Sequence, residues 1–391
     1  MKRSIYAFAW DLVDQSRDHI ISEFRGIGLN GVTFAGACDM GPVLRLHGRK
    51  GRLAFPEDGA VYFRPQAQAY AGIEPRVSQL LDERDVLADI TGSRRMSVAL
   101  FLAPFNNRRL GTDRPDLCCV NAFADHYPHC LAPTNQQIRD YAVELCRDVA
   151  QNYAIDEIVL EAPSWLPPDP SWRGPSHQMG RNIWLNSMLS LSFSESDRAG
   201  AAKAGIDIEG LRQRIASRVD QYLSSDVDPP FEMAVEWLID DYQTDPELVA
   251  YQRWLADQVR SLMLTIREAL PSHVKFAILP RPFNGGSDFH KSGHDMLALE
   301  QAADRLEIPL FSAPNIDGPA EVFDMRRRTG HATVFGAVLR VGQPNIQSRD
   351  QLEDTVRTAL RLGAEGLSFA HYGSLRAREL RWIGDVMGTL R

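Results

Sequence analysis

The sequence of 391 residues lacks any apolar run near the ~20 residues that a membrane-spanning helix requires. Its five cysteines are few and odd in number, which predicts reduced thiols and a cytoplasmic location. Basic residues are scattered and the net charge is −8, so we expect neither nucleic acid nor an anionic membrane as the main partner. The first residues carry no small-residue cleavage site, and we interpret them as a strand and not as a signal peptide.

Common catalytic and cofactor motifs are also missing. There is no Walker loop, HExxH, GxSxG or CxxC, and Cys118-Cys119 is an adjacent pair without metal-ligand spacing. His126 and His129 lie three apart beside Asp125, which permits a metal site, but a hydrogen-bonded loop is the favoured interpretation. We therefore expect no cofactor and no bound metal.

Strand-like and helix-like segments alternate along the whole chain. The expected strands are 4–10, 31–35, 97–103, 155–161, 275–279, 308–312, 333–339 and 366–370. The expected helices are 19–28, 74–90, 135–153, 246–270, 295–306, 320–329, 349–362 and 375 to the end. This pattern predicts an α/β fold, a (β/α)8 TIM barrel forming one domain over 1–391, with long loop insertions after strands 2 and 4. A doubly wound open sheet is the competitor, and the missing GxGxxG turn after the first strand argues against it.

The segment 155–161 is the most informative stretch. Its apolar run, Ile158 to Leu160, is typical of a parallel strand buried on both faces, and Glu161 follows at once. An acid at the end of an apolar strand is costly when it is buried without a partner. Glu161 is therefore either a functional carboxyl group or half of a structural ion pair with Arg281 or Arg340.

Active sites of such barrels lie where strands end and loops begin. The residues after the expected strands combine acids, amides, arginines and aromatic groups, which is the mixture that carbohydrate binding requires. The candidate catalytic residues are Glu161, Asp11 and Asp317. The candidate substrate-binding residues are Asn106, Asn107, Trp165, His177, Arg281, Arg340, His371 and Tyr372.

The insertion 162–244 follows the candidate acid directly. Trp165, Trp172 and His177 lie near its start, so we expect it to form a lid or wall over the site. An oligomer contact made by the same aromatic residues is the alternative, and this leaves a homo-oligomer open.

The order of these motifs resembles a known group of proteins. Pro133-Thr134-Asn135 before an amphipathic helix, and then the strand ending at Glu161, is similar to the glycoside-hydrolase-like TIM-barrel family. The segments 121–125 and 369–373 fit one largely uncharacterised branch of it. The resemblance implies a (β/α)8 fold and chemistry on sugars, with Glu161 matching the strand-four acid.

Two features depart from that family. Where relatives place a second acid after strand seven or strand five, this chain has Arg340 or Arg281. Where relatives carry a Cys-Phe-Cys-x-x-Cys segment that could hold a structural metal, this chain has 192–197, Ser-Phe-Ser-Glu-Ser-Asp. A zinc site is therefore not expected.

Three functions remain open. The leading hypothesis is a glycoside hydrolase acting on a small-molecule carbohydrate, with Glu161 as general acid/base and a second carboxylate from Asp11 or Asp317. The insertion acids Glu236, Asp240 and Asp241 rank behind those two because strand ends are more rigid. The alternatives are a metal-dependent sugar isomerase or epimerase and a non-catalytic sugar-binding barrel.

Overall fold

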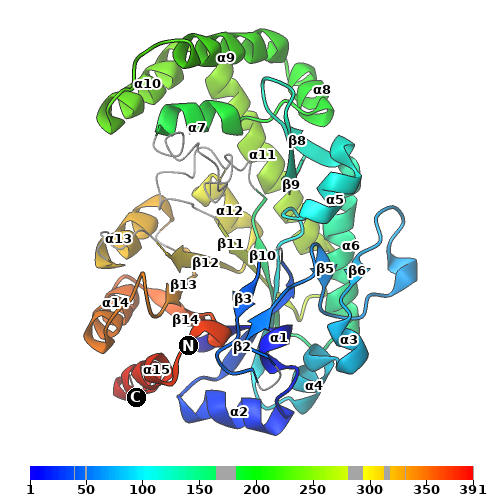
Figure 1. Cartoon of the computed structure of the whole chain (residues 1–391), viewed down its shortest axis with the longest axis vertical. Helices are drawn as coiled ribbons and strands as arrows, with labels where there is room; N and C mark the ends of the chain where they lie inside the picture. Colours follow the sequence, from blue (N-terminus) through cyan, green and yellow to red (C-terminus); the bar gives the residue numbers. More distant parts are fainter. Residues whose placement is uncertain are drawn as a thin grey trace.

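A closed barrel of parallel strands forms the centre of the molecule. The structure, a computed structural model, describes residues 1–38, 40–48, 51–163, 182–280, 294–311, 318–330 and 332–390. In this described part, β1 (Lys2–Phe8) pairs with both β2 (Gly31–Ala37) and β14 (Ala364–Ala370), which closes the sheet. The circle is completed by β7 (Ser97–Leu102), β10 (Glu157–Glu161), β11 (Lys275–Leu279), β12 (Arg305–Leu310) and β13 (Phe335–Arg340). The predicted (β/α)8 TIM barrel is confirmed (Figure 1).

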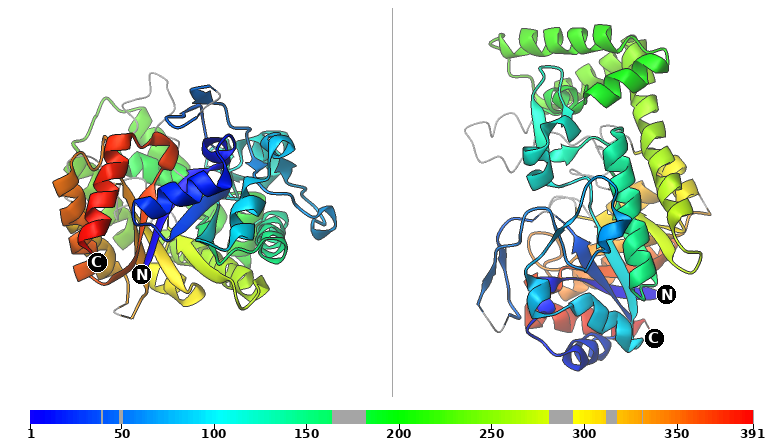
Figure 2. Two further views of the ribbon diagram at one scale, coloured as in Figure 1. Left: turned by 90° about the horizontal axis from the view of Figure 1, so that it is seen from below. Right: turned by 90° about the vertical axis from the view of Figure 1, so that its right-hand side faces the viewer.

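Helices surround this barrel (Figures 1 and 2). They are α2 (Arg17–Gly26), α3 (Leu80–Glu83), α4 (Val86–Ser93), α6 (Gln136–Asn152), α11 (Pro246–Ala269), α12 (Met296–Ala302), α13 (Gly318–Arg328), α14 (Arg349–Arg361) and α15 (Ala377–Thr389). The start of α6 is fixed by Asn135, whose side chain accepts a hydrogen bond from the Gln137 amide at 3.0 Å. One face of α6 is buried and the other is not, as its apolar spacing predicts.

Two expected helices are wrong in extent. Residues 74–90 form β6 (Arg76–Val77), α3 and α4, because Arg84 is extended and Asp85 starts a new helix by capping the Ala88 amide at 2.9 Å. Helix 295–306 ends earlier, at Ala302, and β12 begins three residues later. In both segments the apolar residues keep a helical spacing past the point where the helix ends, and this spacing misled the prediction.

Small elements fill the long loops. After β2 come β3 (Val43–Leu44), β4 (Leu53–Ala54), β5 (Ala60–Val61) and η1 (Ala67–Ala69), and after β7 come α5 (Arg108–Asp113), η2 (Pro115–Leu117), β8 (Cys118–Val120) and β9 (His126–Leu131). His126 and His129 thus lie on a strand of a hairpin, where a loop was expected. The ring of His126 contacts the Pro115 carbonyl oxygen at 2.9 Å through Nδ1.

The insertion after β10 contains four helices in its described part: α7 (Ile183–Ser190), α8 (Glu195–Lys203), α9 (Ile208–Leu223) and α10 (Phe231–Thr244). Figures 1 and 2 show them gathered at one end of the long axis, away from α2 and α15. They pack on one another and on α11, and their buried side chains belong to the same apolar cluster as those around the barrel. No helix in the described ranges has the length and apolar character needed to cross a bilayer.

Candidate functional site

Three of the predicted site residues lie at the carboxyl ends of barrel strands. Glu161 is the last residue of β10, Arg340 is the last residue of β13, and His371 follows β14 directly. In the strand register, Glu161 is level with Leu279 and Arg340 is level with Ala370. All three are partly buried, so each reaches the barrel mouth without being fully exposed.

The Arg340 guanidinium is held against an aromatic ring. Its central carbon lies 4.2 Å from the centroid of the Phe311 ring, and burial lowers the pKa of Arg340. Near it, the His371 ring lies 6.1 Å from the Tyr6 ring and 5.2 Å from the Phe8 ring, between centroids. Burial first, and then the Arg340 charge, lower the pKa of His371 to about 4. His371 is therefore neutral at pH 7 and can donate and accept hydrogen bonds.

Directly below the mouth, one layer of the barrel interior is filled mainly by small apolar side chains. Ala99, Val159, Ala277 and Val338 pack together there with Tyr6. The Tyr6 ring also packs edge-on against Phe101, with ring centroids 5.8 Å apart.

Asp11 is less open than the sequence suggested. It lies in the short helix α1 (Ala9–Leu12) directly after β1, it is 2% exposed, and its Oδ2 accepts a hydrogen bond from the Phe8 amide at 3.3 Å. A Cβ added at Gly373 would lie 2.1 Å from its Oδ1, so that backbone covers the carboxyl group. Burial raises the pKa of Asp11 to about 7. Its role in catalysis stays a prediction.

The two asparagines follow β7 and differ in their surroundings. Asn107 is buried and caps α5, since its Oδ1 accepts a hydrogen bond from the Leu110 amide at 3.0 Å. Asn106 is partly buried. The cap employs the Asn107 oxygen in local structure, and substrate binding by either asparagine stays a prediction.

Tyr372 directs its hydroxyl group towards α2. That group donates a hydrogen bond to the Glu23 carboxylate at 2.7 Å, and the ring is stacked on His47 with centroids 4.5 Å apart. Tyr372 is 1% exposed, within the 3-10 helix η4 (Tyr372–Ser374). These contacts give it a structural role, whereas contact with substrate stays a prediction. Trp165, His177, Arg281 and Asp317 lie outside the described residues.

His294 is a residue that the sequence analysis missed. It is 5% exposed, and its Nε2 lies 3.0 Å from the carbonyl oxygen of Pro163, two residues beyond Glu161. Burial lowers the pKa of His294 to about 4, so the ring is neutral at pH 7. It ties the segment before α12 to the segment that leaves β10. No local motif marks this role, because the contact joins residues 131 positions apart.

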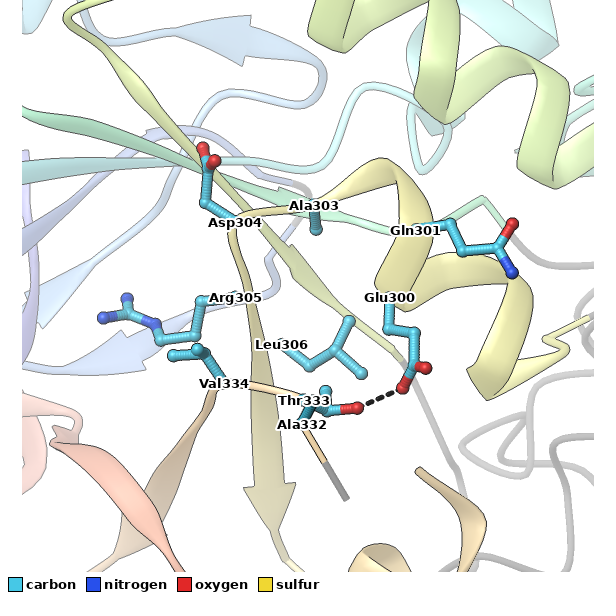
Figure 3. A pocket seen from close by; sticks show the side chains of 9 residues that line it. All are labelled: Glu300, Gln301, Ala303, Asp304, Arg305, Leu306, Ala332, Thr333 and Val334. Carbon is cyan, nitrogen blue, oxygen red and sulfur yellow. Dashed lines mark hydrogen bonds between the residues drawn. The ribbon is translucent and has the colours of Figure 1, made fainter. Parts of the chain in front are cut away.

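A pocket of about 240 Å³ lies at the opposite end of β12, where Arg305 and Leu306 begin that strand (Figure 3). In its wall, the Glu300 carboxylate accepts hydrogen bonds from the Thr333 hydroxyl group and, at 2.9 Å, from the Gly330 amide. This pocket lies at the amino ends of the strands, whereas barrel active sites lie at the carboxyl ends. Within the described ranges, no three or more His, Cys, Asp or Glu side chains are grouped as metal ligands.

No protein-family model matches this chain, and no curated protein matches it either. Solved structures with a similar fold include a β-galactosidase from the psychrophilic Marinomonas ef1, at 12% identity and TM-score 0.60 over 100% of this chain and 59% of that one. The catalytic domain of β-amylase from Paenibacillus polymyxa matches at 12% identity and TM-score 0.58, over 100% of this chain and 98% of that one. α-L-Fucosidase isoenzyme 2 from Paenibacillus thiaminolyticus matches at 12% identity and TM-score 0.57, over 100% of this chain and 49% of that one.

These neighbours are glycoside hydrolases, and the likeness at this identity shows the fold. The chain spans about half the length of the fucosidase and 59% of the galactosidase. The resemblance to glycoside-hydrolase-like barrels inferred from the sequence is therefore confirmed at the level of architecture, and the chemistry has to be argued from the site.

Proposed function

We propose that the chain is a glycoside hydrolase in which Glu161 acts as general acid/base. The observation that carries this proposal is the place of Glu161, which is the last residue of β10 and partly buried at the carboxyl end of a barrel. The similarity of that barrel to several glycoside hydrolases supports the same conclusion. A carboxyl group at such a position can protonate the oxygen of the leaving group.

Glycosidic cleavage normally needs a second carboxylate. Of the two residues predicted for this role, Asp11 is 2% exposed, covered by the backbone of Gly373, and has a pKa of about 7. An ionised carboxylate facing the sugar is difficult to supply from that position. We therefore favour Asp317 as the partner of Glu161, and this choice rests on the sequence prediction and on the burial of Asp11.

The mouth supplies groups that suit a sugar. Neutral His371 and, on our proposal, Asn106 bind hydroxyl groups by hydrogen bonds, while Arg340 contributes a charged donor already oriented by its contact with Phe311. Trp165, His177 and Arg281 complete the proposed contacts as predicted from the sequence, and the insertion 162–244 forms the proposed wall.

Turnover of two substrates by Glu161→Gln tests the proposal. We expect kcat to fall by about 10²–10⁴-fold on natural glycosides and by less on aryl glycosides with activated leaving groups, which need little protonation. The matched control is Glu365→Gln, an exposed glutamate on β14, which should keep wild-type turnover on both. Equal losses on the two substrates would contradict a general-acid role for Glu161.

A non-catalytic sugar-binding barrel is the second candidate, favoured by the burial of Asp11 and by Arg340 at the strand end where relatives carry an acid. Calorimetric titration with oligosaccharides separates the two functions. Binding that leaves every glycoside intact on long incubation would establish the second candidate and refute the first.

A further inference from the structure

Arg340 at the barrel mouth is a partly buried cation without a counter-ion in the described part of the chain. It shares the inward-facing alternation of Val338, which packs in the barrel interior. Within the described ranges its guanidinium forms no ion pair and no hydrogen bond, and it lies over the Phe311 ring, 4.2 Å from the centroid. Taking a cation out of water without a partner is costly, so a structural ion pair does not explain this residue.

Another inward-facing arginine of the same barrel, Arg305, has different surroundings. At the start of β12, its Nη2 lies 2.7 Å from Glu157 Oε1 and 2.5 Å from Glu307 Oε1. Burial acts to lower the pKa of Arg305, but the two carboxylates outweigh it and raise that pKa, whereas burial lowers the pKa of Arg340. The barrel therefore neutralises Arg305 with carboxylates of its own, and among the described residues it provides none for Arg340.

The contact with Phe311 determines which atoms of Arg340 stay available. A guanidinium group is planar and its N–H donors point outwards in that plane, so a ring against one face leaves the edge free. A carboxylate or a sulfate matches this edge with two parallel hydrogen bonds. Phe311 directly follows β12 and packs against the apolar cluster of the interior. The ring therefore orients the guanidinium before any ligand binds.

His371 adds a neutral hydrogen-bond donor beside this cation. It directly follows Ala370, which is level with Arg340 in the strand register. Its ring lies over the inward-facing rings of β1, 6.1 Å from Tyr6 and 5.2 Å from Phe8 between centroids. Burial first, and then the Arg340 charge, lower the pKa of His371, so the imidazole adds an N–H donor at pH 7 and no second charge.

We propose that Arg340, held on Phe311 and flanked by His371, binds the negatively charged group of an acidic sugar, either a carboxylate or a sulfate ester. This inference rests on the proposed function and names the class of its substrate. The acidic group supplies the counter-charge that no described residue gives to Arg340. A neutral sugar excludes water from the mouth and leaves the cation unpaired, so the site discriminates between sugars by charge.

The thermal shift caused by matched sugars tests this charge preference without any need for turnover. The pairs are D-glucuronate with D-glucose, D-galacturonate with D-galactose, and glucose 6-sulfate with glucose, all at equal ionic strength. We expect the acidic member of at least one pair to raise the melting temperature, and its neutral member to leave it unchanged. Comparison of the carboxylate pairs with the sulfate pair identifies the acidic group. Equal shifts from both members of every pair would overturn the proposal.

Arg340→Gln and the control Arg327→Gln separate a binding role from a structural one. The Arg327 side chain is 63% exposed, and its loss changes the net charge by the same amount. We expect Arg340→Gln to keep or raise the melting temperature of the free protein and to bind the acidic sugar about 10–100-fold more weakly, whereas Arg327→Gln binds it as the wild-type protein does. Arg340→Lys keeps the charge without the planar fork, so it should retain a smaller shift, and it replaces Arg340→Gln should that variant fail to fold.

Turnover of the matched 4-nitrophenyl glycosides distinguishes failure of this inference from failure of the proposed function. We expect kcat/KM of the wild-type protein to be about 10–100-fold higher for the acidic glycoside than for its neutral partner, and Arg340→Gln to remove that difference. Neutral glycosides cleaved through Glu161 as fast as acidic ones would overturn the inference and leave the hydrolase standing. Acidic sugars that bind through Arg340 and are never cleaved would support the inference and refute the hydrolase. An Arg340→Gln protein that melts earlier than the wild-type protein and keeps the acid-induced shift would make Arg340 a structural cation.

Discussion

Asp11→Asn should change how the stability of the protein depends on pH. The carboxyl group of Asp11 is 2% exposed, and Gly373 approaches so closely that a Cβ there would lie 2.1 Å from Oδ1. Burial raises the pKa of Asp11 from 3.8 to about 7, although the Phe8 amide and the Arg45 charge oppose the shift. Asparagine has nearly the same shape, keeps an oxygen for the Phe8 amide and carries no charge at any pH.

The magnitude follows from the size of the pKa shift. Each pKa unit corresponds to about 1.4 kcal/mol, so the shift from 3.8 to about 7 amounts to about 4 kcal/mol. Since the folded-state pKa is raised, the contribution of protonated Asp11 is fully present below pH 3.8 and is lost as the pH rises through about 7. Between pH 5 and pH 8 the loss is about 3 kcal/mol in the wild-type protein and absent in Asp11→Asn.

Urea denaturation at pH 5 and at pH 8 measures this difference. The free energy of unfolding of Asp11→Asn should fall less than that of the wild-type protein between the two values, so the variant gains relative stability at pH 8. Asp18→Asn is the control, because the Asp18 side chain is 69% exposed and this variant should follow the wild-type protein. Parallel behaviour of Asp11→Asn and the wild-type protein would refute the reasoning.

Four further substitutions test other parts of the structure. Buried His294 has a pKa of about 4, so its neutral form contributes stability above pH 6.5 that is lost as the pH falls through 4. Thermal melts should therefore show that acid destabilises His294→Gln by about 3 kcal/mol less than it destabilises the wild-type protein. Gly111→Ala would place a Cβ 2.1 Å from a backbone oxygen, so its free energy of unfolding should fall by about 1–3 kcal/mol. Gly92→Ala would meet no atom within 4 Å, so its free energy of unfolding should rise by about 0.5–1 kcal/mol. Urea titrations measure both changes. Asp197→Asn should lose about 1–3 kcal/mol in the same assay, because its buried carboxylate accepts bonds from Thr134 and from two serines; no loss would show that these bonds are dispensable.

The barrel could be predicted because each strand is a short apolar run between polar loops. β10 and β11 match the expected ranges closely, and the expected ends of β12 and β13 are displaced by one to three residues. The failure over 74–90 has a different origin, since hydrophobic spacing cannot report that Arg84 is extended or that Asp85 caps a new helix. The secondary structure of residues 74–90 is therefore set by capping and turn geometry and not by apolar content.

The candidate site was only partly accessible from the sequence. The rule that barrel sites lie after strands found Glu161, Arg340 and His371, because it depends only on where strands end. The same rule gave Asp11 and Tyr372 the same weight, yet their environments are set by contacts with distant residues. Burial depends on tertiary packing, so local spacing could not separate these two residues from the first three.

Two glutamates on β10 allow the structural and functional roles of a barrel acid to be compared on one strand. Glu157 and Glu161 are four positions apart and face the same side of the strand. Glu157 is bound by Lys2 and by Arg305, the latter at 2.7 Å, so Glu157→Gln leaves two buried cations with a single carboxylate, Glu307, and should cost about 3–5 kcal/mol. Glu161→Gln should instead keep the melting temperature and lose turnover, because Glu161 lies at the mouth. A Glu161→Gln protein that melts as early as Glu157→Gln, while each folded molecule keeps its turnover, would make Glu161 a structural ion pair and remove the basis of the proposed mechanism.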